Sequence, residues 1–480
     1  MKRFAALFAI GACMFSVLTH AENESWKQQF QKASDEYFDQ VYFPYQPSAG
    51  TAVGYHQYDS QLENFSHKKI DAEITALQSF ENRIEAIHPD GSKADFVPRS
   101  DREIVLGNIR SQLLTLETIR PWEKNADNYS STCANGAFTL MERKFAPPDD
   151  RLRSLIAREK QMPGLVAEAR ANLWNPPRVY TEIAIEQLPG IISFFEHDVP
   201  QAFADANDPA LKAEFTQTNA AVVAALSSYL DWLKTDLLSR SNGDFRIGAE
   251  TFSKKLEYDE MVDIPLDKLL EIGWGDMRKN QAHFNQVAKE LEPNKDAHAV
   301  LEELGEDHPA PGQLLDTFRA KFNGLVAFIR SHHIVTIPSD VRPIVEETPP
   351  FMRATTMASM DTPGPFETHS TEAYFNVTLP DTSMTPAEVE GFMHSFNVGT
   401  VISTAVHEAY PGHYVQFLWL PQAPSRVRKL LGANTDVEGW AHYTEQMMLD
   451  EGYGQPGQGA KDERESKFLR LGQLQDALLR

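Results

Sequence analysis

Cysteine is almost absent from this chain of 480 residues, which has only Cys13 and Cys133. Cys13 lies within the expected leader peptide, so Cys133 has no partner for an intrachain disulfide, and a disulfide-stapled fold is excluded. Cys133 could be a nucleophile, but a buried structural thiol is the favoured interpretation.

Several signatures of common enzyme classes are also missing. The chain has no G-x-S-x-G serine elbow, no phosphate loop, no G-x-G-x-x-G after a strand and no cysteine pair for a structural zinc. Carboxylates are numerous, but no spacing singles out a glycosidase pair. Positive charge is scarce, with 45 Lys and Arg against 68 Asp and Glu and a net charge of −23. This balance disfavours nucleic acid and anionic membranes as partners.

Only the N-terminus contains a long apolar run. Lys2 and Arg3 precede the run at 4–18, and small residues at 19–21 form a cleavage site. We therefore expect a signal peptide over residues 1–21 and a periplasmic or secreted protein. An alternative is lipid anchoring at Cys13, because the preceding Ile-Gly-Ala resembles a lipobox, although the apolar run continues past it.

The main functional signal is the heptapeptide HEAYPGH, residues 407–413. In zinc peptidases the pattern H-E-x-x-H places two histidines one helical turn apart on one metal, with the glutamate as general base. Here His407 and His413 are six residues apart, which on a straight helix turns the rings about 120° from each other. Pro411 and Gly412 predict a break that could return His413 towards His407, with Glu408 as the base. A helix end flanked by solvated histidines is the alternative.

The flanking sequence predicts rigid mountings for this motif. Thr385 to Glu388 reads as a capping box, and apolar residues from Phe392 to Val406 favour a buried helix that ends at His407. A second helix is expected from Asn434 or Thr435 to Met448.

Glu438, near the start of that second helix, is the predicted third metal ligand. The alternative is that Glu438 only caps its own helix through Thr435. His442 and Glu445 lie one and two turns further on the same face, as rival ligands or partners of the ligands. Gly439 is unusual in a helix and would be explained by close approach of another group.

Helical patterns dominate the rest of the chain. They cover residues 25–41, 71–87, 99–118, 150–173, 177–198, 209–240, 265–291 and 311–332. We expect a mostly α fold: one large helical domain over residues 22–480, with two lobes around a central cleft and a short β-sheet near the active site.

The best strand signal is at residues 372–378, just before the motif helix. As an exposed edge strand it could pair with a peptide backbone. Tyr374, Asn376 and Tyr410 are the candidate substrate-binding residues. His369 and Tyr414 join the two tyrosines as candidates for stabilising an oxyanion.

The sequence resembles the bacterial family catalogued as domain of unknown function 885. The resemblance rests first on HEAYPGH followed by VEGWAHYTEQMM. It also rests on four earlier segments that occur in the order of the family: YQPSAGTAVGYHQYDSQLENFS, RPWEKNADNY, the long KFAPPDD segment and EETPPFMR. It implies a helical protein similar to gluzincin peptidases, with Zn²⁺ held by His407, His413 and Glu438 and with Glu408 as general base. Members usually continue for a further helical segment, so we expect this chain, which ends in a helical pattern at 467–480, to be truncated.

Two functional hypotheses follow. The first is an exported zinc metallopeptidase that hydrolyses peptide bonds with a metal-bound water and Glu408 as base. The second is a non-catalytic exported protein that binds peptides or other ligands and derives from a truncated peptidase.

Overall fold

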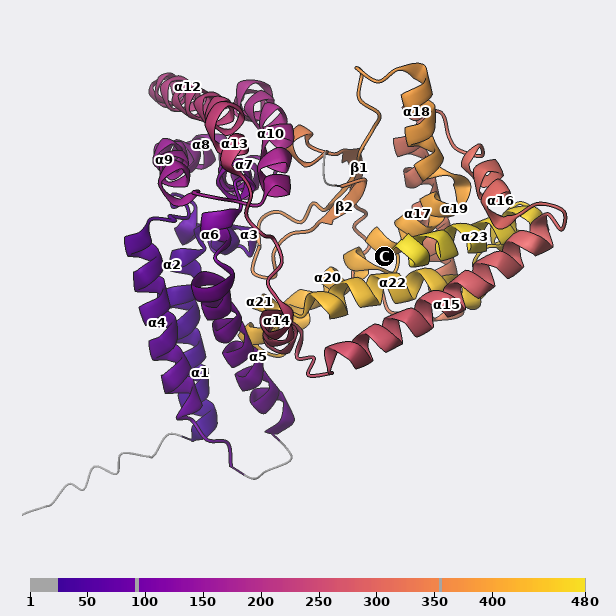
Figure 1. Ribbon diagram of the computed structural model, residues 1–480, viewed down its shortest axis with the longest axis horizontal. Helices are drawn as coiled ribbons and strands as arrows, with labels where there is room; N and C mark the ends of the chain where they lie inside the picture. Colours follow the sequence, from indigo (N-terminus) through magenta and orange to yellow (C-terminus); the bar gives the residue numbers. More distant parts are fainter. Residues whose placement is uncertain (1–24, 91–94, 354–355, 480) are drawn as a thin grey trace, which may run out of the picture.

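Helices form most of the chain in the computed structural model, which describes residues 25–90, 95–353 and 356–479. The helices up to α13 occupy one side of the molecule in Figure 1, and most of those from α15 onward occupy the other side, with a small sheet between them. Helix α21 is the exception and lies beside α5. The expected mostly α fold with a short sheet is therefore confirmed. The cleft between two lobes stays a prediction. The expected signal peptide and the lipobox at Cys13 lie outside the described residues.

The N-terminal group of helices packs around buried aromatic and aliphatic side chains such as Phe30, Tyr37 and Ile109. Its elements are α1 (Trp26–Tyr37), α2 (Phe43–Tyr45), α3 (Pro47–Ala52), α4 (His67–Glu85), α5 (Phe96–Leu113) and α6 (Pro121–Lys124). Two π-helical segments, Phe38–Tyr42 and Leu114–Ile119, extend α1 and α5.

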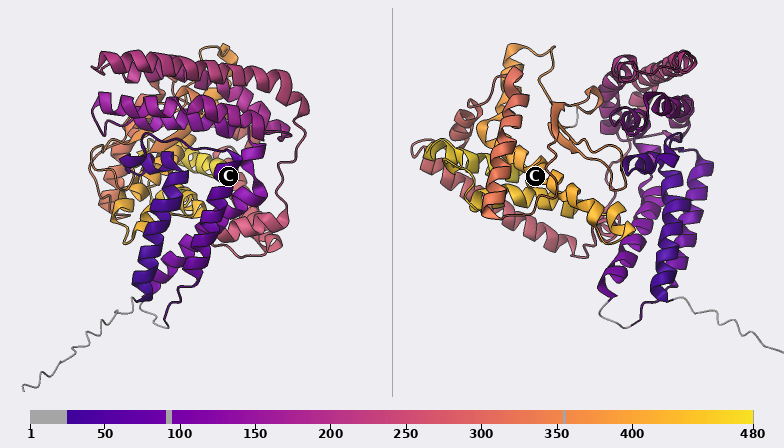
Figure 2. Two further views of the ribbon diagram at one scale, coloured as in Figure 1. Left: turned by 90° about the vertical axis from the view of Figure 1, so that its left-hand side faces the viewer. Right: turned by 180° about the vertical axis from the view of Figure 1, so that it is seen from behind.

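A second stack of helices, seen end-on at the right in the rear view of Figure 2, adjoins the first. Its elements are α7 (Asp127–Met141), α8 (Pro148–Glu159), α9 (Met162–Asn172), α10 (Arg178–Ser193), α11 (Val199–Ala202), α12 (Pro209–Trp232) and α13 (Leu238–Arg240). Helices α7 to α10 and α12 share one large apolar core.

The remaining helices lead to and surround the motif. They are α14 (Ala249–Glu260), α15 (Leu266–Leu291), α16 (Ala297–Gly305), α17 (Leu314–His332), α18 (Pro386–Met393), α19 (Val398–Glu408), α20 (His413–Trp419), α21 (Arg426–Leu430), α22 (Asn434–Asp450) and α23 (Glu463–Leu479). Short strands β4 (Gln455–Pro456) and β5 (Gly459–Ala460) lie between α22 and α23.

The small sheet has the strand order β1-β3-β2, with β1 (Ile344–Glu347), β2 (Ala358–Asp361) and β3 (Tyr374–Val377). Strand β3 pairs with β1 in parallel and with β2 antiparallel. The strand predicted at 372–378 therefore exists, but the expectation that it forms an exposed edge is wrong, because β3 is the middle strand. The edges are β1 and β2.

Most predicted helices are confirmed, including the long patterns at 209–240 and 265–291. The pattern at 150–173 was expected as one helix and forms two, α8 and α9. Pro163 occupies the first turn of α9. Proline lacks an amide donor and clashes with a preceding turn, so it favours the start of a new helix there.

The segment leading to the motif is also divided. Thr385 and Glu388 form the predicted capping box of α18. A 3₁₀ turn follows at His394–Phe396, and Asn397 then caps α19 by accepting hydrogen bonds from the amides of Gly399 and Thr400. An asparagine that satisfies these amides starts a new helix, so the motif helix is shorter than expected.

Helix α21 of the C-terminal half packs against the N-terminal helices. Val427 is buried in their core. Arg426 forms ion pairs with Asp35 and Asp39, and Arg428 with Asp101. The two halves of the chain therefore share packed surface.

Candidate metal centre

Helix α19 holds His407 and Glu408 on its last turn. Its first turn is close to α23, where a Cβ on Gly399 would lie 2.7 Å from the carbonyl oxygen of Phe468. Only glycine permits this approach of the two backbones. Because eight of its eleven residues are buried, α19 is a rigid mounting for the two motif residues.

The backbone turns back on itself directly after Glu408. The amides of Ala409 and Tyr410 both donate to the carbonyl of Ala405, and the amide of Gly412 donates to that of Val406 at 3.0 Å. A Cβ on Gly412 would lie 1.7 Å from the carbonyl oxygen of His407, so no other residue fits. The predicted helix interruption is confirmed, since α20 begins anew at His413.

This reversal brings the two imidazoles of the motif together. The ring centroids of His407 and His413 are 4.7 Å apart and nearly perpendicular, at 85°. His407, Glu408 and His413 each offer a possible ligand atom within 4.8 Å of the others. The six-residue spacing is thus compatible with a shared site because the helix is broken.

Glu438 reaches the same place from α22. Its Oε2 is 3.5 Å from Nε2 of His407 and 3.7 Å from Nε2 of His413. Ligands of tetrahedral zinc, at about 2.0–2.1 Å from the ion, lie about 3.3 Å from one another. The donor set and its separations therefore fit a zinc ion with small side-chain adjustments.

Glu445 lies behind His407 instead of facing the shared site. Its Oε1 is 2.7 Å from Nδ1 of His407, and its Oε2 accepts a hydrogen bond from Ser403 Oγ at 2.9 Å. A carboxylate accepts, so Nδ1 of His407 carries the proton and Nε2 presents its lone pair to Glu438 and His413. Of the two rivals, Glu445 is thus placed as a partner of a histidine, and His442 lies 3.6 Å from that same carboxylate.

The competing explanation for Glu438, a capping box with Thr435, is not formed. The amide and hydroxyl of Thr435 both donate to Glu260 of α14, at 2.9 and 2.8 Å. The start of α22 is instead tied to the motif by Trp440, whose Nε1–H donates to the carbonyl of Pro411 at 3.0 Å. No described protein atom would meet a Cβ on Gly439 within 4 Å, so the close approach expected there does not come from another part of the chain.

The comparisons with known proteins agree with this architecture. The model of the family described as "Bacterial protein of unknown function (DUF885)" matches residues 47–480. The chain belongs to this family. A solved structure provisionally described as a lipoprotein of unknown function from Shewanella oneidensis is similar, with 25% identity and a TM-score of 0.69. The similarity covers 93% of this chain and 80% of that one. The comparison with curated proteins found no match.

The DUF885 chain buries most of the predicted substrate-binding side chains. Asn376 is 1% exposed and Tyr410 is not exposed. Tyr410 packs against Phe322 and Tyr414, and burial raises the pKa of its phenol. Tyr374 is half-buried, with Arg143 over its ring. The structure therefore does not bring these three residues to an exposed face.

The remaining oxyanion candidates are also engaged elsewhere. The hydroxyl of Tyr414 donates to the carbonyl of Val341 at 2.9 Å. The amide of His369 donates to Glu367, and its side chain stands on an exposed loop.

Sequence reasoning missed Ser403. It lies one turn before His407 on the same buried helix face. A hydroxyl at a buried position next to a motif histidine could have indicated a hydrogen-bonding role there.

Cys133 is fully buried, and burial raises the pKa of its thiol to about 12. A thiol with such a pKa is a poor nucleophile, which supports the structural interpretation. Within the described ranges, no helix has both the length and the apolar character needed to cross a bilayer.

Proposed function

We propose that this DUF885 protein is a zinc-dependent peptidase similar to the gluzincins, with His407, His413 and Glu438 as ligands. The carrying observation is the convergence of both Nε2 atoms on Glu438 Oε2, at 3.5 and 3.7 Å. Two imidazoles and one carboxylate form the donor set of catalytic zinc sites that keep an open position. Bound zinc would supply Lewis-acid activation of water and of a carbonyl group.

Glu408 is the proposed general base. It follows His407 directly and lies within 4.8 Å of the possible ligand atoms of both histidines. A carboxylate at this distance can accept a proton from an attacking water and deliver it to the leaving amine. Glu445 has a different task, because it fixes the ring and the tautomer of His407.

A peptide is the proposed substrate, and export is part of the same proposal. Strand β2 lies at an edge of the sheet, contacts α19, and has four half-buried residues. An extended peptide can add to such an edge through its backbone. In this proposal the peptide backbone pairs with β2, and not with β3 as first expected.

The test compares metal content and peptide cleavage in the purified chain and three variants. Glu408→Gln should keep stoichiometric zinc and lose at least about 10²-fold in cleavage rate, because the proton acceptor is removed while the shape is kept. His413→Ala should lose cleavage and the zinc bound at this centre. His298→Ala is the control, since that side chain is exposed on α16.

Three outcomes would contradict the proposal. Full activity in zinc-loaded Glu408→Gln would remove this residue from the mechanism, and zinc loss in that variant would make it a ligand. Stoichiometric zinc with no cleavage by the unmodified chain would favour the non-catalytic binding protein.

A further inference from the structure

A second group of metal-ligand side chains lies at the other end of the motif helix. His308 follows α16, while Glu390 and His394 lie one turn apart on α18 and the 3₁₀ turn after it. Residues four apart share a helix face, and both of these face the His308 loop. Glu390 Oε1 is 3.2 Å from Nε2 of His308 and 3.7 Å from Nε2 of His394.

We propose that His308, Glu390 and His394 bind one divalent transition-metal ion of the zinc class. The two nitrogen–oxygen separations bracket the value of about 3.3 Å expected around a tetrahedral zinc ion. One possible ligand atom from each residue lies within 4.8 Å of the other two. Two imidazoles select Zn²⁺, Co²⁺ or Ni²⁺ over Ca²⁺ and Mg²⁺, which prefer oxygen ligands.

His308 is held in the form that ligates a metal. Its Nδ1 is 2.9 Å from the carbonyl oxygen of Pro309. A carbonyl can only accept, so Nδ1 carries the proton and Nε2 keeps a lone pair towards Glu390.

The His394 ring is also fixed. It rests on the end of α16, where a Cβ on Gly305 would come within 3.0 Å of Nδ1. Its ring centroid is 5.8 Å from that of His308.

The histidines of this group are more exposed than those of the candidate centre at His407. The side chains of His308 and His394 are 11% and 34% exposed, and that of Glu390 is 60% exposed. At the first centre the histidines are 6% and 9% exposed and Glu438 is 55% exposed. In both groups two imidazoles face one solvent-accessible carboxylate, which leaves room for water as a further ligand.

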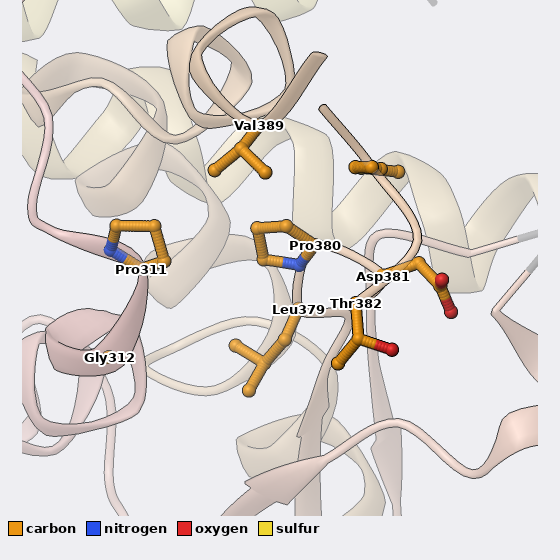
Figure 3. Close-up of a pocket in the computed structure, with 8 residues that line it drawn as sticks. Pro311, Gly312, Leu379, Pro380, Asp381, Thr382 and Val389 are labelled. Carbon is orange, nitrogen blue, oxygen red and sulfur yellow. The ribbon is translucent and has the colours of Figure 1, made fainter. Parts of the chain in front are cut away.

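The surroundings show what such an ion would do. The amide of Val398, the first residue of α19, donates to the carbonyl of Asp307 at 2.8 Å. The chain just after His308 and helix α18 also border a pocket of about 310 Å³, lined by Pro311 and Val389 among others (Figure 3). An ion between His308 and His394 would fasten the α16 end to the start of the motif helix. The site is therefore a clamp, and it does not depend on the proposed catalysis.

The experiment uses the full chain carrying His407→Ala and His413→Ala, which removes the first centre from the measurement. After chelation and dialysis, this background should bind one equivalent of Zn²⁺ in a calorimetric titration. Adding His394→Ala or His308→Ala should abolish that binding. Adding Glu390→Gln, a change at an exposed side chain that the fold tolerates, should weaken it at least tenfold. Zinc should also raise the unfolding temperature of the background protein.

His298→Ala is the matched control, because His298 faces Glu302 at 3.8 Å on α16 as an i,i+4 pair. This control should still bind one equivalent. The proposal is overturned if the background binds no zinc, or if zinc persists undiminished in Glu390→Gln. The first result would leave the group a surface ion-pair cluster of small energetic value. The second would show that Glu390 is not a ligand. The proposed centre at His407 is tested separately with the unsubstituted chain. If that chain binds only one equivalent of zinc, the centre at His407 does not bind zinc.

Discussion

At the scale of single residues, the pair of His407 and Glu445 explains how one carboxylate can control a metal ligand without touching the metal. Glu445 is buried on α22, and its two oxygens bind the His407 ring and Ser403. An isolated buried carboxylate would be unfavourable, and these two hydrogen bonds compensate for its desolvation. The ring is thereby fixed in orientation and in tautomer.

Glu445→Gln should weaken zinc binding about 10- to 100-fold while the chain stays folded, because the amide keeps the shape but loses the charge that supports the imidazole. Competition with a chromophoric chelator measures the affinity. Asp450→Asn is the control on the same helix, since Asp450 pairs with Arg470 at the surface. Equal affinities in all three proteins would show that Glu445 has no influence on the metal.

Glu159 provides a pH-dependent contribution to stability. Burial raises the pKa of its carboxyl from 4.5 to about 7, although Thr218 and Asn219 donate hydrogen bonds to it. The folded state therefore holds a proton that the unfolded state releases, and stability falls as pH rises from about 4.5 to about 7. The pKa difference corresponds to at most about 3 kcal/mol.

Glu159→Gln should remove this loss, so that its stability relative to the original chain increases between pH 5 and pH 8. Urea unfolding at both pH values measures the difference. Glu214→Gln, at a side chain that is 44% exposed, should show no such change. A constant difference between the original chain and Glu159→Gln at both pH values would contradict the assignment.

The residues of the metal centre differ in how far the sequence alone predicts them. His407, Glu408 and His413 stand out because their chemistry and spacing lie within one heptapeptide. Glu438 could be predicted because it lies near the start of a second helix, and that start was recognisable in the sequence. Ser403 and the orientation of Glu445 follow from helix packing across 42 residues of sequence, which no local pattern encodes.

At the scale of elements, the junction between α19 and α20 is the decisive piece of local structure. Three hydrogen bonds from the amides of residues 409, 410 and 412 return to the carbonyls of Ala405 and Val406. The Pro411-Gly412 pair predicted the helix break, because proline lacks an amide donor and glycine adopts backbone conformations that other residues do not. The resulting distance between the histidines depends on tertiary packing and was not predictable.

Gly412→Ala should destabilise the chain by about 3 kcal/mol or more, because the added Cβ overlaps backbone atoms that cannot move without opening the junction. Zinc at this centre should be lost with it, as His413 shifts. Gly391→Ala is the matched control on α18, where a Cβ meets nothing within 4 Å; it should stabilise the chain by about 0.5–1 kcal/mol. Chemical unfolding and metal analysis check both. A Gly412→Ala protein with unchanged zinc and stability would show that the junction tolerates a side chain.

Errors in element prediction share one cause. The patterns at 150–173 and 385–408 have continuous helical periodicity, and each forms two helices. Pro163 and Asn397 mark the divisions, but proline and asparagine also occur inside longer helical segments, and Pro189 lies within α10. The strand β3 was predicted from its residue types, whereas its central position depends on β1 and β2, which had weak signals.

At the scale of the whole molecule, α21 connects the part that holds the candidate metal centre to the N-terminal helices. Val427 is 3% exposed within the N-terminal core. Arg426 donates to Asp39 at 2.6 Å and Arg428 to Asp101 at 2.7 Å. Because Asp101 is itself buried, separating the two parts would leave its charge unpaired. This interface favours the single domain expected over residues 22–480, which stays a prediction.

If the chain unfolds as one cooperative unit, zinc at His407 and His413 should stabilise the distant helix α5 as much as α19. Saturation at one hundred times the dissociation constant contributes about 2.7 kcal/mol, or about 3 °C in unfolding temperature for a chain of this length. Hydrogen exchange measured by mass spectrometry, with and without chelator, follows peptides from both helices. The comparison uses the His394→Ala chain, which lacks a ligand of the proposed second site. Adding His407→Ala to it should remove the chelator effect. A chelator effect restricted to α19, α20 and α22 would instead divide the chain into two independently unfolding domains.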